Sequence, residues 1–228
     1  MNYIEITYSK EKALDLERFR EMDYYAVENY NLPIELMMEN AGLQLANLIG
    51  NSSELNQVIL IGVGNGNNGG GGLVAARRLV AWGYDVYLDI PVEITKELPK
   101  KQFKRAIDFG VKSTSIENPD VWVDAYLGFS QRLPIDEKFA LRVEAANKSS
   151  ALKIALDIPT GFLGNIEEIY FKADKVITLA APKDILYNLD LNTEIYIADL
   201  GIPKKIYSEF EMEIPPFQTN NILKLKRK

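Results

Sequence analysis

The sequence predicts an α/β fold, a three-layer α/β/α domain built around a mostly parallel central sheet with two N-terminal helices. Short apolar runs alternate along the chain with segments in which apolar residues recur at helical spacing. The runs are nearly continuous in apolar residues, which is typical of parallel strands buried on both faces. This alternation requires crossover connections and places helices on both sides of the sheet.

The predicted elements begin with a helix over residues 13–30, where apolar side chains follow the 3.6-residue period. A second helix follows with Pro33 in its first turn. The predicted strands lie at 57–64, 85–90, 121–128, 152–161, 175–181 and 194–201, with a weak strand at 111–116. Three further helices are expected. One directly follows the glycine run after residue 64, and the others lie at 99–109 and 135–147.

No linker, internal repeat or low-complexity tract divides the chain, so we expect one domain over residues 1–228 with its core at about 10–205. Residues 206–228 are expected to form an irregular C-terminal extension. Its last residues, KLKRK, are basic. Two interpretations stay open for this tail, a solvated end of the chain or a contact with an anionic partner.

Composition narrows the classes of function. The net charge of −6 argues against a general nucleic-acid binder, which needs a basic surface. No apolar run reaches about 18 residues, so no membrane association is expected. The charged N-terminal segment has no apolar signal-peptide region, and we expect a cytoplasmic protein.

Cysteine and histidine are both absent from the 228 residues. This excludes thiol nucleophiles, disulfides, zinc clusters and histidine-based triads. Proton transfer must therefore use Asp, Glu, Lys, Tyr or water. A bound metal ion would have oxygen ligands.

Polar sequences follow three of the predicted strands, and ligands bind beyond the carboxyl ends of strands in such sheets. One is the glycine run after Ile61, the second starts at Asp124 (DAYLGFSQRLP), and the third starts at Asp157 (DIPTG). A carboxylate just beyond a buried strand is partly desolvated, so its pKa can move. Either Asp could instead cap the loop that follows it.

The glycine run lies within GVGNGNNGGGGLVAARRL, residues 62–79. Gly64 to Gly69 fit the pattern G-x-G-x-x-G, and Asp89 lies 20 residues after Gly69. This spacing is that of a dinucleotide-binding fingerprint, so an NAD-linked oxidoreductase is one alternative. The glycines, however, continue past the position at which a helix should begin.

Several motifs in order resemble the NAD(P)H-hydrate epimerase family, the YjeF N-terminal domain, whose members include proteins similar to apolipoprotein A-I-binding protein. They are REMDYYAVENYNLPIELMMENAG, GNGNNGGGGLVAARRL, VDAYLG, LDIPTG, FKADKVITLAAPK and ADLGIP. The resemblance implies a Rossmann-like domain that forms a homodimer and interconverts the R and S epimers of hydrated NADH or NADPH, a small-molecule substrate. It also implies that a separate dehydratase acts on the product, because no dehydratase or kinase-like domain is expected in this chain.

The resemblance also assigns site residues. Asp157 would contact the hydrated nicotinamide and transfer the proton. A potassium ion, one per subunit, would be held by Asn68, Asp124 and Thr160, whose hard oxygen donors suit an alkali cation. The other implied substrate-binding residues are Asn67, Asn68, Gly69, Gly70, Gly71, Gly128, Phe129, Ser130, Gln131, Arg132, Leu133 and Pro134.

Gly71 departs from the family pattern, which has Asp at this position. A carboxylate in the first turn of a helix would interact favourably with the helix dipole and add a charged group to the site. Its loss predicts a slower epimerase. The alternative is a non-catalytic relative that binds a nucleotide or serves as a scaffold.

Overall fold

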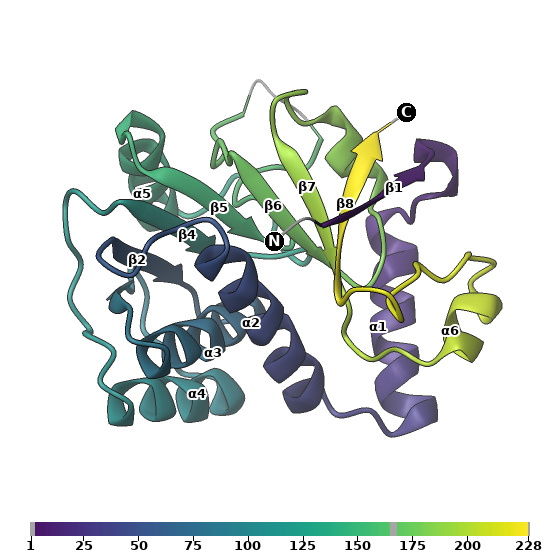
Figure 1. Cartoon of the computed structure of the whole chain (residues 1–228), viewed down its shortest axis with the longest axis horizontal. Coiled ribbons are helices and arrows are strands. Elements are labelled where there is room, and N and C mark those ends of the chain that lie inside the picture. Colours follow the sequence, from purple (N-terminus) through teal and green to yellow (C-terminus); the bar gives the residue numbers. More distant parts are fainter. Residues whose placement is uncertain (1–2, 165–167, 228) are drawn as a thin grey trace.

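The computed structural model describes residues 3–164 and 168–227. Eight strands form one sheet in the order β1-β8-β7-β6-β5-β4-β2-β3 (Figure 1). Neighbouring strands are parallel, except that β7 and β8 are antiparallel. The strands are β1 (Ile4–Tyr8), β2 (Val58–Val63), β3 (Asp85–Asp89), β4 (Val121–Ala125), β5 (Leu152–Leu156), β6 (Lys175–Leu179), β7 (Glu194–Ala198) and β8 (Ile222–Arg227).

Helices connect most of these strands, and the two predicted N-terminal helices are confirmed. The helices are α1 (Leu16–Tyr30), α2 (Ile34–Gly50), α3 (Asn67–Ala81), α4 (Glu97–Asp108), α5 (Glu137–Lys148) and α6 (Lys204–Glu209), with 3₁₀ turns η1 (Lys10–Lys12) and η2 (Asp184–Asn188). Asp15 caps α1 by accepting a 2.8 Å hydrogen bond from the backbone N–H of Arg18. None of the described helices combines the length and apolar content needed to cross a membrane.

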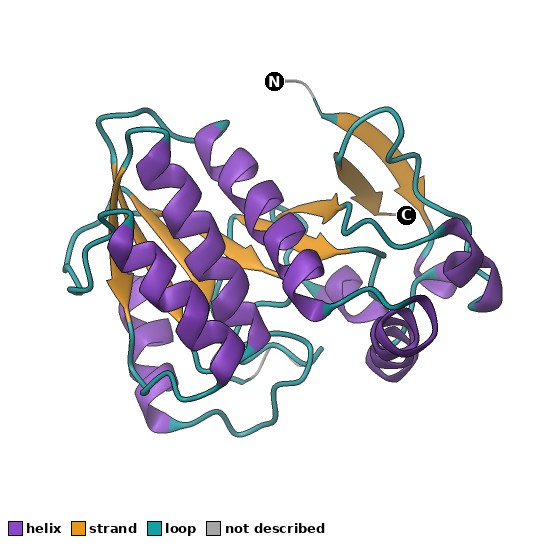
Figure 2. Cartoon of the chain, turned by 90° about the horizontal axis from the view of Figure 1, so that it is seen from below, coloured by secondary structure: helices purple, strands orange, loops and turns teal. Residues whose placement is uncertain are grey.

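The strands divide the core into two clusters, which confirms the three-layer architecture. Ile59, Ile61 and Val63 of β2 join the cluster under α2, α3 and α4, whereas Leu60 joins the cluster on the opposite face with α1 and α5. Alternate residues of a strand point to opposite faces, so both faces of β2 are buried. Helix α3 packs between α2 and α4 in one layer (Figure 2).

The four consecutive glycines lie inside α3, so the prediction that this helix begins after the glycines is wrong. The helix begins at Asn67, and Gly69 to Gly72 are all buried in it. A Cβ atom on Gly69 would lie 2.1 Å from the carbonyl oxygen of Gly64, and one on Gly72 would lie 2.6 Å from Cβ of Ala125. The glycines therefore allow the helix to approach the sheet more closely than side chains would permit.

Both termini form strands, which corrects the irregular extension predicted for 206–228. In β8, Leu223 pairs with Ile4 of β1 and with Ile197 of β7. Arg227 donates to the carbonyl oxygens of Leu189, Asp190 and Thr193 at 2.7, 2.7 and 2.9 Å. The basic tail is thus fixed to the sheet as far as Arg227, and Lys228 lies outside the described residues.

The weak strand expected at 111–116 is a single bridge between Lys112 and Tyr87. The backbone N–H of Lys112 donates to Val86 O at 3.0 Å, and Leu88 N donates to Lys112 O at 2.8 Å. This segment therefore pairs with β3 at the edge of the sheet without extending the sheet by a strand.

Candidate active site

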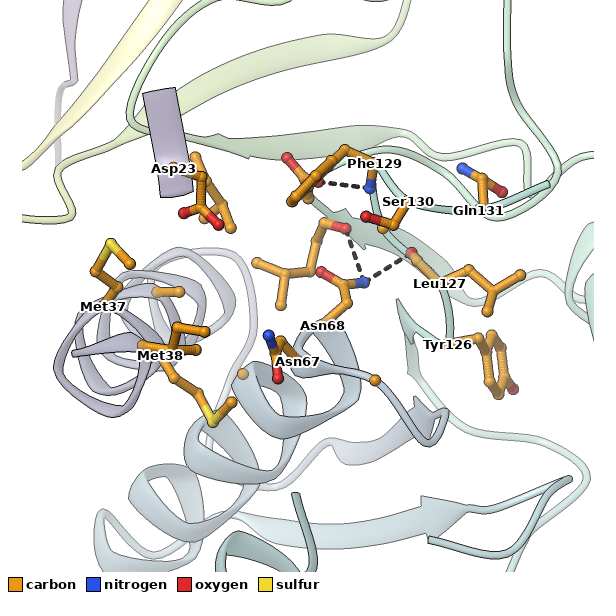
Figure 3. A pocket seen from close by; sticks show the side chains of 18 of the residues that line it. Asp23, Met37, Met38, Asn67, Asn68, Tyr126, Leu127, Phe129, Ser130 and Gln131 are labelled. Carbon is orange, nitrogen blue, oxygen red and sulfur yellow. Dashed lines mark hydrogen bonds between the residues drawn. The ribbon is translucent and has the colours of Figure 1, made fainter. Parts of the chain in front are cut away.

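A cavity of about 470 Å³ opens at the carboxyl ends of β2, β4 and β5, where the strand-end sequences predict a site (Figure 3). Helices α1 and α2 and the start of α3 contribute to its walls. The predicted residues that line it are Asn67, Asn68, Gly71, Gly128, Phe129, Ser130, Gln131 and Asp157. The predicted substrate-binding residues outside its lining are Gly69, Gly70, Arg132, Leu133 and Pro134, and the predicted cation ligands Asp124 and Thr160 lie outside it as well.

The loop after β4 reaches the cavity through residues 128–131 and is held in place by Gln131. The Gln131 side chain accepts a 2.6 Å hydrogen bond from Gly161 N and donates to Pro159 O at 3.2 Å. Phe129 packs edge-on against Phe19 of α1, with ring centroids 5.1 Å apart. The loop is therefore anchored both to the segment after β5 and to α1.

Asp157 is the carboxylate that the sequence places at this cavity, and it is buried there. Its backbone has a positive φ of 70°, a left-handed conformation that Asp and Asn adopt more readily than other side chains. Its Oδ2 accepts a 2.9 Å hydrogen bond from Phe129 N, and its Oδ1 lies 2.9 Å from Nζ of Lys183. These contacts fix the orientation of the carboxylate.

Lys183 follows β6 and is fully buried, and the sequence reasoning missed it as a site residue. Besides the ion pair with Asp157, its Nζ donates to Thr178 Oγ1 at 2.9 Å and to Leu179 O at 3.1 Å. The Nζ also lies 3.5 Å from the centroid of the Phe19 ring, a cation–π contact. Burial lowers the pKa of Lys183, and the charge of Asp157 opposes that shift. No periodicity marks a lysine just beyond an apolar strand as part of a site.

Asp23 of α1 also lines the cavity, and it too was missed. Burial and the charge of Asp157 raise its pKa to about 6, while Lys183 acts in the opposite direction. A signal for it exists in the sequence: Asp23 lies four residues after Phe19 and three before Ala26, on the apolar face of the helix. A carboxylate at such a position is a candidate functional group.

Asp124 and Thr160 form a buried network beneath the cavity. One carboxylate oxygen of Asp124 accepts from Thr160 N at 2.7 Å, and the other accepts from Thr160 Oγ1 at 2.7 Å. Burial raises the pKa of Asp124 to about 7, although these hydrogen bonds lower it. Within the part of the chain that the structure describes, Asp124 has no ion-pair partner.

The predicted cation ligands Asn68, Asp124 and Thr160 carry hard oxygen donors, the kind that alkali cations prefer. Asn68 uses its amide N–H groups to donate to Leu127 O and Leu156 O, at 2.7 and 3.2 Å (Figure 3). Residues 3–164 and 168–227 contain no group of three or more His, Cys, Asp or Glu side chains that could hold a metal ion. One buried carboxyl group without an ion-pair partner among the described residues, together with amide and hydroxyl oxygens, suits an alkali ion better than a transition metal.

The dinucleotide fingerprint is not completed by Asp89. Its side chain is buried, and its Oδ2 accepts a 2.5 Å hydrogen bond from the hydroxyl of Tyr126. Its Oδ1 lies 3.3 Å from Nε of Arg142. These partners occupy the carboxylate that would bind the ribose hydroxyls of NAD, so the geometry disfavours the oxidoreductase alternative.

Gly71 lines the cavity but lies beyond the first turn of α3, which starts at Asn67. The favourable interaction expected between an Asp at this position and the helix dipole is therefore weaker than the sequence predicts, because that effect falls off within the first turn. A Cβ atom at this position would have one tight contact, 3.0 Å to a terminal methyl of Leu156.

Known proteins resemble both the sequence and the fold. The family described as YjeF-related protein N-terminus matches residues 34–185. A protein of Rhodopirellula baltica named NAD(P)H-hydrate epimerase is 35% identical, with 86% of this chain and 87% of the relative covered. A protein of Aedes aegypti with the same name is 30% identical over 92% of this chain and 97% of its own length.

Two further matches are to a longer protein and to a solved structure. A bifunctional NAD(P)H-hydrate repair enzyme of Thermofilum pendens is 28% identical, and the match covers 89% of this chain and 43% of that protein. The crystal structure of the yeast protein YNL200c superposes with a TM-score of 0.86 at 25% identity. That match covers 94% of this chain and all of the yeast chain.

Proposed function

The chain belongs to the family of YjeF-related protein N-termini, and on that premise we propose that it is an NAD(P)H-hydrate epimerase, an isomerase of nucleotide repair. The buried pair of Asp157 and Lys183 at the cavity is the observation that carries this proposal. Epimerisation needs proton transfer and no redox step, so a carboxylate can perform it in a chain that contains no histidine.

Asp157 is the proposed proton-transfer group. Hydration of a dihydronicotinamide ring leaves a hydroxyl on a ring carbon bonded to the ring nitrogen. In the proposed route, inversion at this carbon proceeds by loss of that hydroxyl as water and addition of water to the opposite face. Lys183 and the N–H of Phe129 hold the carboxylate in one orientation toward the cavity. Such preorganisation supports general acid–base catalysis, which typically contributes about 10²–10⁴ in rate.

The start of α3 is the proposed contact for the dinucleotide. Among the residues that the structure describes, no side chain caps this helix, so its first N–H groups are open to an anion, and Asn67 and Asn68 face the cavity beside them. Residues 128–131 complete the wall on the other side of Asn68. These groups would bind the substrate's pyrophosphate and ring and would exclude water.

We extend the proposal to a potassium ion at Asn68, Asp124 and Thr160. Its support is the buried carboxyl group of Asp124, which has no ion-pair partner among the described residues and accepts a hydrogen bond from the hydroxyl of Thr160. When bound, the ion would neutralise this carboxylate and tie α3 to the loop after β5. The chain's own residues perform the proton transfer.

The remaining parts of the proposal concern the oligomeric state, the partner enzyme and the cellular location of the protein. We propose a homodimer, which light scattering of the purified protein would test. We also propose that a separate dehydratase uses the product, since a relative is named as a bifunctional repair enzyme of which this chain matches 43%. We further propose a cytoplasmic location, because the substrate derives from cofactors of intracellular metabolism.

A coupled assay tests the proposed activity. R-NADHX is supplied with an S-specific dehydratase, and recovery of NADH is followed in the presence of potassium. We expect the protein to raise the rate of recovery well above that of spontaneous epimerisation. A folded protein without this effect would contradict the proposal.

A further inference from the structure

Asp23 is a second carboxyl group at the cavity, and the proposed function does not yet use it. It comes from α1, whereas Asp157 follows β5, so two separate elements direct carboxyl groups into one cavity. Figure 3 shows the Asp23 side chain projecting from its helix toward the space between α2 and the loop that carries Phe129. Among the described residues it forms neither a hydrogen bond nor an ion pair, so its carboxyl group is available to a ligand.

Inversion of a carbon makes a demand that one carboxylate does not meet easily. The hydroxyl leaves from one face of the ring, and water must return to the opposite face. A proton must therefore be delivered on one face and removed on the other. Lys183 and Phe129 fix the orientation of the Asp157 carboxylate, so this group would reach only one face of a bound ring.

We propose that Asp23 is a catalytic residue that works with Asp157 as a pair of proton-transfer groups, one for each face of the hydrated ring. This inference rests on the proposed epimerase function. Lys183 serves the pair as a positioning residue through its contact with Asp157.

The reaction uses one proton, which Asp23 donates in the first step and Asp157 takes up in the second. Protonated Asp23 donates to the hydroxyl, the C–O bond breaks, water leaves, and the ring-nitrogen lone pair forms a C=N bond. Water then adds to the other face, a C–O bond forms, the C=N electrons return to nitrogen, and Asp157 takes the proton. The proton returns to Asp23 directly or through solvent, and the reverse reaction exchanges the two roles.

The electrostatics agree with this division of roles. The pKa of Asp23 is raised to about 6 by burial and by the charge of Asp157, against the effect of Lys183. Asp23 therefore holds a proton more readily than an ordinary Asp, while Asp157 faces an ammonium group 2.9 Å away. Two carboxyl groups in different environments are the usual basis for separate acid and base roles.

The first test compares Asp23→Asn with wild type and with Glu21→Gln, a control at an exposed acidic position of the same helix. We expect kcat to fall by about 10²–10⁴ in Asp23→Asn with little change in KM, and both values to stay unchanged in the control. Circular dichroism checks folding, and Asp23→Ser replaces the Asn variant if that variant does not fold. A wild-type kcat in the substituted protein overturns the proposal.

Oxygen exchange separates catalysis from a structural role. Each pure epimer is incubated with enzyme in H₂¹⁸O, and label at the hydrated carbon is measured. We expect Asp23→Asn to exchange oxygen in only one epimer, and Asp157→Asn to exchange it in only the other. Equal slowing of both epimers in Asp23→Asn overturns the assignment of Asp23. An inactive wild-type protein contradicts the epimerase function itself, whereas an active wild type with a fully active Asp23→Asn contradicts only this inference.

Discussion

The Nζ of Lys183 lies 2.9 Å from Oδ1 of Asp157, and both side chains are withdrawn from solvent, with exposed fractions of 0% and 1%. Removing one member of a buried pair leaves the other charge uncompensated, at a cost of about 3–5 kcal/mol. We therefore expect Lys183→Met to lower the free energy of unfolding by about this amount, measured by urea denaturation. Lys204→Met, at an exposed helix position, is the control and should change little.

A double variant separates the charge effect from lost packing around Lys183. In Asp157→Asn with Lys183→Met, no buried charge remains at the pair, so we expect more stability than in Lys183→Met alone. If the stability lost in the double variant equals the sum of the losses in the two single variants, the two side chains are not coupled.

The pH dependence of stability reports on Asp23. Its pKa is raised from 3.8 to about 6, so the folded state binds the proton more tightly than the unfolded state. Stability therefore falls as pH rises from about 4 to about 6 and this contribution is constant above that window. We expect Asp23→Asn to be more stable than wild type at pH 7–8 and equal to it near pH 4, in urea midpoints measured across this range. A difference independent of pH would contradict the raised pKa.

The close approach of α3 to the sheet predicts that Gly69 cannot carry a side chain. A Cβ at this position would lie 2.1 Å from a backbone oxygen, so Gly69→Ala should cost about 1–3 kcal/mol in the free energy of unfolding. Gly66→Ala is the matched control, because a Cβ at Gly66 meets no atom within 4 Å. Equal denaturation midpoints for the two variants would show that α3 does not need this approach.

Potassium should stabilise the protein through Asp124. A ligand that binds only the folded state adds about 1.4 kcal/mol for each tenfold excess over its Kd, or about 3–6 °C in Tm for a chain of this size. We expect this rise in KCl relative to tetramethylammonium chloride at equal ionic strength, and its loss in Asp124→Asn. Identical melting temperatures in the two salts would rule out the cation site.

Local sequence pattern was sufficient for the parts of the fold in which each element buries its own apolar surface. Strands β2 to β7 and helices α1 to α5 were predicted because their periodicity is set by burial in the core. Strands β1 and β8 were missed because their main partners lie at opposite ends of the chain, as in the pairing of Ile4 with Leu223. Charged residues in β8, such as Lys224, also make this strand resemble a solvated tail.

The candidate site likewise contains residues that the sequence predicted and residues that it did not. Asp157 was predicted because it directly follows a buried strand. Asp23 and Lys183 come from segments 134 residues before and 26 residues after Asp157, and only the fold brings them together. The start of α3 was predicted too late because sequence alone did not show that Gly70 and Gly72 of this helix pack against Met38 and Ala125.

The most direct test of the central claim is the rate at which a pure epimer of the hydrated cofactor is converted to the mixture by wild type and by Asp157→Asn. Asn keeps an oxygen for the N–H of Phe129 and tolerates the positive φ of 70°, so the local geometry is preserved although Lys183 loses its charge partner, and circular dichroism checks that the variant folds. Chromatographic separation of the epimers should show fast equilibration with wild type and a rate reduced at least about 100-fold with Asp157→Asn. Equilibration by Asp157→Asn at the wild-type rate would contradict the claim that this carboxylate transfers the proton.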